Sequence, residues 1–364
     1  MKRLVVPVAL LVVVGGCTGP WPSTPPSADP APVSAQPLRP RAGHSATLLA
    51  DGRVLLAGGC AVDGCTTSEV EPSSEFYVPG RGFAPGPPML HPRSSHTATL
   101  LPDGRVLIVG GWAKEGTTSL AEAEMFDPTT GTFQPAGTLQ GGATLLPDGR
   151  VLIAGGGNGP GNLTAGVEIF DPATGSLTPG PAMPQPRQAA SIVLPDGDIL
   201  ITGGQDGPQH GLSSTVIYDP GSGDWRAGPK MGSPRFKHAI TMLDDNRILV
   251  LGGTTDDTEL LASTEVLDLA ANEFAPGPVM TAPRYKFADA VVRTTTGRLV
   301  VAGGTQVDVL APDGQSFGAI TIGTGARRWV PTATALRDGT VLVVGGYDDR
   351  IRVHSDAHIV EAGP

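Results

Sequence analysis

A Gly-Gly pair recurs seven times in this chain, each time directly after a short apolar run. Successive pairs lie 52, 45, 48, 49, 51 and 42 residues apart. The pairs are Gly58-Gly59, Gly110-Gly111, Gly155-Gly156, Gly203-Gly204, Gly252-Gly253, Gly303-Gly304 and Gly345-Gly346. This period is typical of propeller blades. The repeat therefore overrides the two or three domains that a length of 364 residues would otherwise suggest.

One unit, residues 93–137, shows how each repeat is expected to fold. Its segments HTATLL, RVLIV, AEMF and TFQPA predict four short strands, named a to d in chain order. The turn PDG joins strands a and b, and the turn DPTTG joins strands c and d. The apolar run of strand b is nearly continuous in every unit, which favours a strand buried on both faces. Four strands at this spacing predict one propeller blade.

The chain ends before the seventh unit is complete. That unit begins at Arg328 and has sequence for three strands only. Residues 31–41, APVSAQPLRPR, are similar to the end of an earlier unit, FAPGPPMLHPR at 83–93. We therefore predict that residues 31–37 supply the outer strand of blade seven and remove an exposed sheet edge. The predicted fold is all-β, a seven-bladed propeller over residues 31–364 with four antiparallel strands per blade.

The double glycine, the Glu-x-Tyr/Phe-Asp-Pro run after it and the strand d aromatic resemble the kelch repeat. The resemblance covers residues 31–364 and implies a kelch-type propeller. It says little about function, because kelch units serve binding proteins, sugar isomerases and copper oxidases alike. The phrase DGRVLxxGG also resembles the propeller of galactose-oxidase-like copper enzymes, which need a Tyr beside a His. Here Gly43, Ser95 or Lys237 precedes each strand a His, so we expect no metal and no cofactor.

The N-terminus resembles an export signal. Residues 1–16 contain two basic residues and an apolar run, Leu4 to Val14, that is too short to span a membrane. Small residues directly before Cys17 resemble the bacterial lipobox, which implies that Cys17 is acylated and becomes the new N-terminus. Residues 17–30 then form the lipidated Cys and a flexible Pro/Ser-rich tether. We expect an exported protein, anchored by lipid to the outer membrane or surface of a bacterium.

Two further cysteines, Cys60 and Cys65, lie close together in the turn-rich segment GGCAVDGCT. In an oxidising compartment such a pair is expected to form a disulfide. A metal site is the weaker interpretation, because two cysteines without a nearby histidine supply only half of one.

The connections between strands predict which face carries a ligand. The a–b and most c–d turns are short and alike, whereas the b–c loops are long and dissimilar. Since the b–c and d–a connections share one face of a propeller, we expect recognition to occur there.

On that face an arginine precedes strand a in six of the seven units; only unit three, TLQGGATLL, lacks it. Converging guanidinium groups would suit a carboxylate or sulfate ligand, but each arginine can equally bond to neighbouring carbonyls and carboxylates. Tyr285 and Trp329 could stack on a sugar or simply pack. The candidate ligand-binding residues are Arg41, His44, Arg93, His96, Arg187, Arg235, His238, Arg284, Tyr285, Arg328 and Trp329.

The composition narrows the function classes. A net charge of −10 disfavours nucleic acid as a partner. The sequence has no GxSxG, HExxH, P-loop or dinucleotide fingerprint, and we assign no catalytic residue. These features favour a non-catalytic binding protein of the cell envelope or surface, with a protein or glycan as ligand. The alternative is a carbohydrate-active enzyme of the sugar isomerase or mutarotase type that uses the arginine- and histidine-lined face.

Overall fold

The computed structural model divides the chain into two units, residues 1–30 and 31–364. The described residues are 34–63, 70, 72–114, 118–157, 162–323 and 325–363. The predicted signal peptide, Cys17 and the tether lie outside them and stay predictions. No helix within the described ranges is long and apolar enough to cross a membrane.

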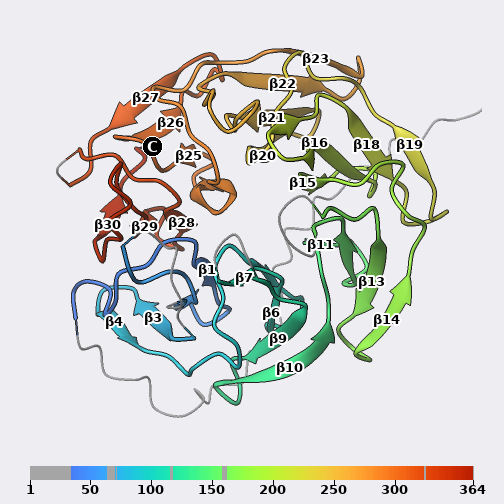
Figure 1. Cartoon of the computed structure of the whole chain (residues 1–364). Helices are drawn as coiled ribbons and strands as arrows, with labels where there is room; N and C mark the ends of the chain where they lie inside the picture. Colours follow the sequence, from blue (N-terminus) through green and yellow to red (C-terminus); the bar gives the residue numbers. More distant parts are fainter. Residues whose placement is uncertain are drawn as a thin grey trace, which may run out of the picture. The chain divides into compact units, whose positions relative to one another are not determined.

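Seven antiparallel sheets surround a common axis in the second unit, one for each sequence repeat (Figure 1). The innermost strands are β1 (Ser45–Leu48), β5 (Thr97–Leu100), β11 (Gly142–Leu145), β15 (Gln188–Val193), β20 (Ala239–Asp244), β24 (Val291–Arg293) and β28 (Thr332–Ala335). The second strands are β2 (Val54–Ala57), β6 (Val106–Val109), β12 (Val151–Ala154), β16 (Ile199–Gly207), β21 (Arg247–Leu251), β25 (Leu299–Val301) and β29 (Val341–Val344).

The third strands are β3 (Ser74–Val78), β9 (Glu122–Asp127), β13 (Val167–Asp171), β18 (Thr215–Tyr218), β22 (Thr264–Asp268), β26 (Val307–Leu310) and β30 (Ala357–Val360). The outermost are β4 (Gly82–Pro85), β10 (Thr132–Thr138), β14 (Ser176–Pro179), β19 (Trp225–Ala227), β23 (Glu273–Pro276) and β27 (Phe317–Ile320). Four short elements lie outside the four-strand pattern of the blades: β7 (Trp112–Lys114), β8 (Thr118–Ser119), β17 (His210–Gly211) and the 3-10 turn η1 (Ala288–Ala290). The predicted all-β, seven-bladed propeller is confirmed.

The second strands carry the core, as their apolar sequences predict. Every residue of β2 and β6 is buried. Apolar side chains from adjacent blades form common layers between the sheets; Leu55 and Phe76 of blade one, for example, pack with Ile108 and Phe126 of blade two. Stability therefore comes from contacts between blades, and a single sheet could not bury both of its apolar faces alone.

The double glycines lie where one blade meets the next. All fourteen of these glycines have positive φ. At Gly58, with φ of +64°, an added Cβ would lie 2.4 Å from the carbonyl oxygen of Arg93 in the following blade. The second glycine donates there instead, since Gly59 N–H bonds to the same oxygen at 2.8 Å. Only glycine adopts positive φ without strain and leaves room for the neighbouring carbonyl, which explains why the pair recurs.

Residues 34–37 do not form the predicted outer strand of blade seven, and residues 31–33 of that predicted strand lie outside the described residues. Among the described residues blade seven has three paired strands, β28, β29 and β30. Ser34 forms a bridge with Phe83 of β4 in blade one instead, through two backbone hydrogen bonds. The Gln36 side chain accepts a bond from Ala357 N–H of β30 at 2.7 Å. The segment from residue 34 onward thus joins blade one to blade seven without extending the last sheet.

Candidate functional site

The arginines that precede the inner strands point into the blades. Four of them are at most 1% exposed: Arg41, Arg93, Arg235 and Arg284. Each forms a buried ion pair with a carboxylate on the third strand of its own blade. The N–O distances are 2.8 Å to Glu75, 2.8 Å to Glu124, 2.7 Å to Glu265 and 2.8 Å to Asp308.

Arg93 shows the bonding of this group. Its guanidinium donates to the carbonyl of Gly110 at 2.8 Å, to the carbonyl of Glu122 at 2.6 Å and to the carboxylate of Glu124 at 2.8 Å. Burial lowers the pKa of Arg93, and the charge of Glu124 opposes that shift. A guanidinium stays protonated under such conditions, so Arg93 and Glu124 form a charged pair that connects the b–c loop to the third strand.

The arginine and the double glycine together link the ring. The backbone carbonyl of Arg93 accepts a bond from Gly59 in blade one, while its side chain bonds to Gly110 in blade two. The carbonyls of Arg187, Arg235, Arg284, Arg328 and Arg41 accept the same bond from Gly156, Gly204, Gly253, Gly304 and Gly346. The repeat of the arginine therefore has a structural cause.

Two arginines depart from this pattern. Arg187 bonds to the carbonyls of Gly203 and Ser214, both at 3.2 Å. Val216 stands at the third-strand position where blades one, two, three, five and six have a carboxylate. Arg328 pairs with Asp356 at 3.0 Å, and its side chain is 16% exposed. Arg328 is thus more accessible than the other predicted arginines.

The three predicted histidines also connect blades. Their Nε2 atoms lie 2.8 to 2.9 Å from hydroxyl groups of the preceding blade: His44 bonds to Thr332, His96 to Ser45 and His238 to Thr202. All three are at most 5% exposed. Desolvation by burial lowers the pKa of each to about 3, and the adjacent arginine adds to the shift. They are neutral at physiological pH.

These contacts correct the prediction of an arginine-lined ligand pocket. The buried guanidinium and imidazole groups are engaged by the protein itself, so they do not form an open anion-binding surface. The structural alternative raised by the sequence is the one that the hydrogen bonds support.

Tyr285 and Trp329 do come together, from units six and seven. Their rings pack edge to face with centroids 5.1 Å apart. The Trp329 indole N–H donates to Asp349 at 2.9 Å, and the Tyr285 hydroxyl lies 3.1 Å from that of Tyr347. Trp329 is only 7% exposed, so packing accounts for its position.

The unit that lacks the arginine has a shortened entry into its inner strand. In blade two, seven residues, 90–96, separate Met89 from β5. In blade three, only Gln140 and Gly141 separate Leu139 from β11. Met89 and Leu139 occupy equivalent positions, because each N–H donates to the third-strand region of the preceding blade. Met89 bonds to the carbonyl of Pro72, three residues before Glu75, and Leu139 to that of Ala121, three residues before Glu124. Blade three therefore lacks five residues that cover the same region in blade two.

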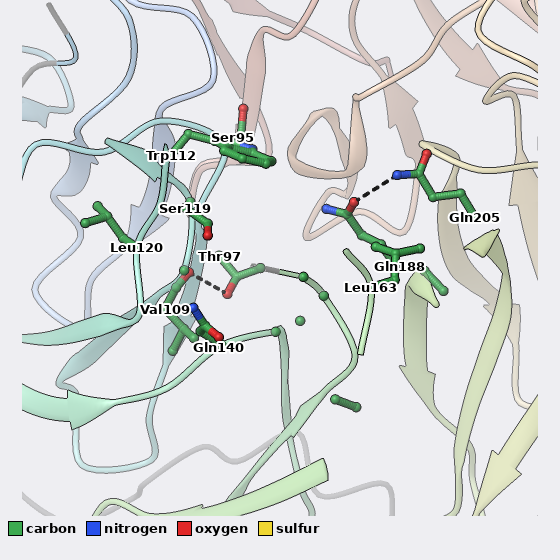
Figure 2. A pocket seen from close by; sticks show the side chains of 18 residues that line it. Ser95, Thr97, Val109, Trp112, Ser119, Leu120, Gln140, Leu163, Gln188 and Gln205 are labelled. Carbon is green, nitrogen blue, oxygen red and sulfur yellow. Dashed lines mark hydrogen bonds between the residues drawn. The ribbon is translucent and has the colours of Figure 1, made fainter. Parts of the chain in front are cut away.

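A cavity of about 230 Å³ opens at this shortened entry. Its walls come from the b–c loop after β6, the entry into β11 and the start of β15, on the face that bears the d–a and b–c connections. Figure 2 shows Thr97 and Gln140 on one side of the hollow and Gln188 and Gln205 on the other. Gln205 donates to the Gln188 side-chain oxygen at 3.4 Å.

The lining combines polar and apolar groups, and none of the described residues in it carries a charged side chain. Among the described residues it contains the side-chain amides of Gln140, Gln188 and Gln205, together with the hydroxyls of Ser95, Thr97 and Ser119. Trp112 and Leu120 supply apolar surface, and glycines expose backbone groups. Amides and hydroxyls can donate and accept hydrogen bonds. The cavity is equipped to bind a neutral polar molecule.

Sequence reasoning missed this cavity, although its signal was present. The absent arginine of unit three was the only interruption in the series, and the linker before it was visibly short. The candidate ligand-binding residues all come from the regular positions of the repeat. The space arises where the repeat omits them.

The predicted Cys60–Cys65 disulfide stays a prediction, because Cys65 lies outside the described residues. Cys60 is buried and forms backbone bridges with Ala42 and Val70. Within the described ranges no group of three or more His, Cys, Asp or Glu side chains is placed to hold a metal ion.

Comparison with known proteins agrees with the fold. Residues 93–140 and 186–232 match the kelch motif. The first segment spans blade two, and the second runs from the entry of blade four through its outer strand. The architecture defines the class as a seven-bladed β-propeller. Two of its seven repeats match the kelch motif, which supports a propeller of the kelch type.

A fungal alcohol oxidase of the AA5 family, solved in complex with copper, has a similar structure. The TM-score is 0.68 at 16% sequence identity, over 89% of this chain and 74% of that chain. At this identity the likeness shows the fold alone. No curated protein matches this chain in sequence.

Proposed function

We propose that this chain is a binding protein of the cell envelope whose ligand is a small neutral saccharide, held in the cavity between blades two, three and four. The carrying observation is the lining of that cavity by three glutamine amides, three hydroxyls and one tryptophan. Saccharides present hydroxyl groups that pair with amides, and ring faces that stack on aromatic side chains. The volume lies just below the range of about 300–1,000 Å³ for drug-sized ligands, which suits a single sugar ring.

The lining favours binding over turnover. General acid–base catalysis needs a titratable side chain within hydrogen-bond reach of the substrate. The described residues around the cavity include no Asp, Glu, His, Lys, Arg, Cys or Tyr. The alternative of a sugar isomerase or mutarotase relied on the arginines and histidines, and most of those are buried in contacts between and within blades.

We further propose that the chain is an exported lipoprotein. The support is the sequence MKRLVVPVALLVVVGGC and the Pro/Ser-rich segment after it, which would hold the propeller away from a lipid surface. Cys17→Ala should release the protein from the membrane fraction and abolish incorporation of radiolabelled fatty acid. A variant that remains lipid-labelled would contradict this assignment.

The saccharide proposal is tested with the full chain in detergent on a glycan array, followed by titration calorimetry of the best neutral ligand. Gln188→Ala should weaken binding about two- to tenfold, the effect of one lost hydrogen bond. Trp112→Ala should weaken it by a similar factor through lost stacking. Gln315→Ala is the matched control, because Gln315 is an exposed glutamine in a turn of blade six.

Two outcomes would reject this function. One is the absence of any neutral glycan ligand. The other is binding that Gln188→Ala and Trp112→Ala leave unchanged at unaltered melting temperature. Turnover of a bound sugar, followed by NMR, would instead favour the enzyme.

A further inference from the structure

Blade three retains the partners of an arginine that it does not contain. Glu168 on β13 pairs in register with Ile153 on β12, two residues before Gly155. Glu75, Glu124 and Glu265 occupy the same register in their own blades, opposite Leu56, Ile108 and Val250. Each of those three binds a buried arginine. Glu168 is therefore the fourth glutamate at this position, and the other three all hold a guanidinium group.

The carbonyl acceptors of the arginine are also retained. In blade five, Arg235 donates to the carbonyls of Gly252 and Ser263 as well as to Glu265. The equivalents in blade three are Gly155 and Gly166, which are themselves joined by a backbone bond of 3.0 Å, as Gly252 and Ser263 are. Two carbonyl oxygens and one carboxylate thus remain in the arrangement that binds a guanidinium elsewhere in the ring.

The same deletion that removed the arginine also uncovered the carboxylate. In blade two, the backbone N–H groups of Leu90 and His91 donate to Glu124 at 2.7 and 2.9 Å. These residues belong to the segment that blade three lacks. Glu124 is 0% exposed, whereas Glu168 is only half-buried and Gly166 is exposed. No hydrogen bond or ion pair involves the Glu168 carboxylate among the described residues.

We propose that blade three binds the guanidinium group of an arginine side chain presented by a peptide or protein partner. The partner's arginine takes the place that Arg93 and Arg235 occupy in their blades, with Glu168 as counter-ion and Gly155 and Gly166 as carbonyl acceptors. A planar guanidinium matches this set of three acceptors, whereas an ammonium group is a point donor. Because Gly166 is exposed and Glu168 is only half-buried, a single side chain of a larger ligand can reach these acceptors. This site adjoins the saccharide cavity, because Gly155 lies between the lining residues Ala154 and Gly156, but Glu168 is not among the described residues that line the cavity.

The test titrates the full chain with the tripeptide Gly-Arg-Gly and with three comparison probes: arginine amide, Gly-citrulline-Gly and Gly-Lys-Gly. Citrulline has the shape of arginine without its charge, and lysine has the charge without the planar set of guanidinium N–H donors. Gly-Arg-Gly should bind at least tenfold more tightly than either of the other tripeptides, and more tightly than arginine amide. Binding of arginine amide alone, with no gain from the peptide, would replace the peptide partner with a free small cation.

Glu168→Gln should reduce the affinity for Gly-Arg-Gly at least tenfold. Glu122→Gln is the matched control, because it removes an exposed third-strand carboxylate in the neighbouring blade. A melting temperature equal to that of the parent confirms that Glu168→Gln still folds. Equal affinity for the arginine and citrulline peptides, or no effect of Glu168→Gln, would overturn the proposal. Neither result bears on saccharide binding, which Gln188→Ala tests separately.

Discussion

Replacement of Arg93 by alanine tests whether the repeated arginines hold the blades together. The side chain is 0% exposed and makes three hydrogen bonds, one of them to the equally buried Glu124. Removing one partner of a buried ion pair leaves an uncompensated charge and costs about 3–5 kcal/mol. Unfolding entropy is about 2.1 cal/mol/K per residue, so over the roughly 330 residues of the ring this loss lowers Tm by about 4–7 °C.

The assay is thermal unfolding followed by circular dichroism at a fixed scan rate. Arg150→Ala is the control, because Arg150 forms an exposed pair with Asp148 and should cost about 0–1 kcal/mol. The double variant Arg93→Met, Glu124→Leu should be more stable than Arg93→Ala, since it removes both charges at once. If Arg93→Ala melts within 1 °C of Arg150→Ala, the structural role assigned to this arginine is refuted, and a ligand-binding role regains support.

Three further predictions concern protonation, backbone geometry and the cysteines. The pKa of His44, His96 and His238 is about 3 in the folded protein and 6.5 in the unfolded chain, so the unfolded chain takes up more protons as the pH falls. Stability should be flat above pH 7 and decrease from pH 6.5 downward; a denaturation midpoint that rises on acidification to pH 5 would contradict this. Gly58→Ala should cost about 3 kcal/mol in urea denaturation, because its Cβ meets a carbonyl at 2.4 Å, whereas Gly80→Ala, with similar φ and open space, should cost about 1 kcal/mol. Alkylation of the unreduced protein followed by peptide mass spectrometry should find Cys60 joined to Cys65; free thiols at both would exclude the disulfide.

Local sequence patterns predicted the blades well because each strand signal is short-range. The predicted strands of unit 93–137 coincide with β5, β6, β9 and β10 to within two residues. The continuous apolar runs of the second strands predicted burial on both faces, and β2 and β6 are fully buried. Closure of the ring was harder to predict, since the N-terminal segment could have joined either of two neighbouring blades. The similarity of residues 31–41 to 83–93 gave no way to choose between them.

The candidate site, unlike the blades, could not be predicted well from local sequence patterns. The sequence showed that an arginine recurs, but the partners of Arg41 and Arg93 are separated from them by 34 and 31 residues in the chain. Whether a guanidinium faces solvent or a glutamate depends on how the third strand packs, which spacing does not reveal. The five residues missing from unit three were visible in the sequence, yet their consequence was not. A shorter linker can close up or leave a cavity, and packing decides which.

The residue pattern alone was enough to predict the number of blades, the strand order within each blade and the need for glycine between blades. These follow from periodicity, strand propensity and turn chemistry, which act over a few residues. Three features became visible only in the folded chain. The arginines and histidines are buried, and blade one meets blade seven through Ser34 and Gln36. Blade three has a cavity beside Gln140 and leaves Glu168 partly exposed. Each of these outcomes depends on which side chains of distant segments fill the same space.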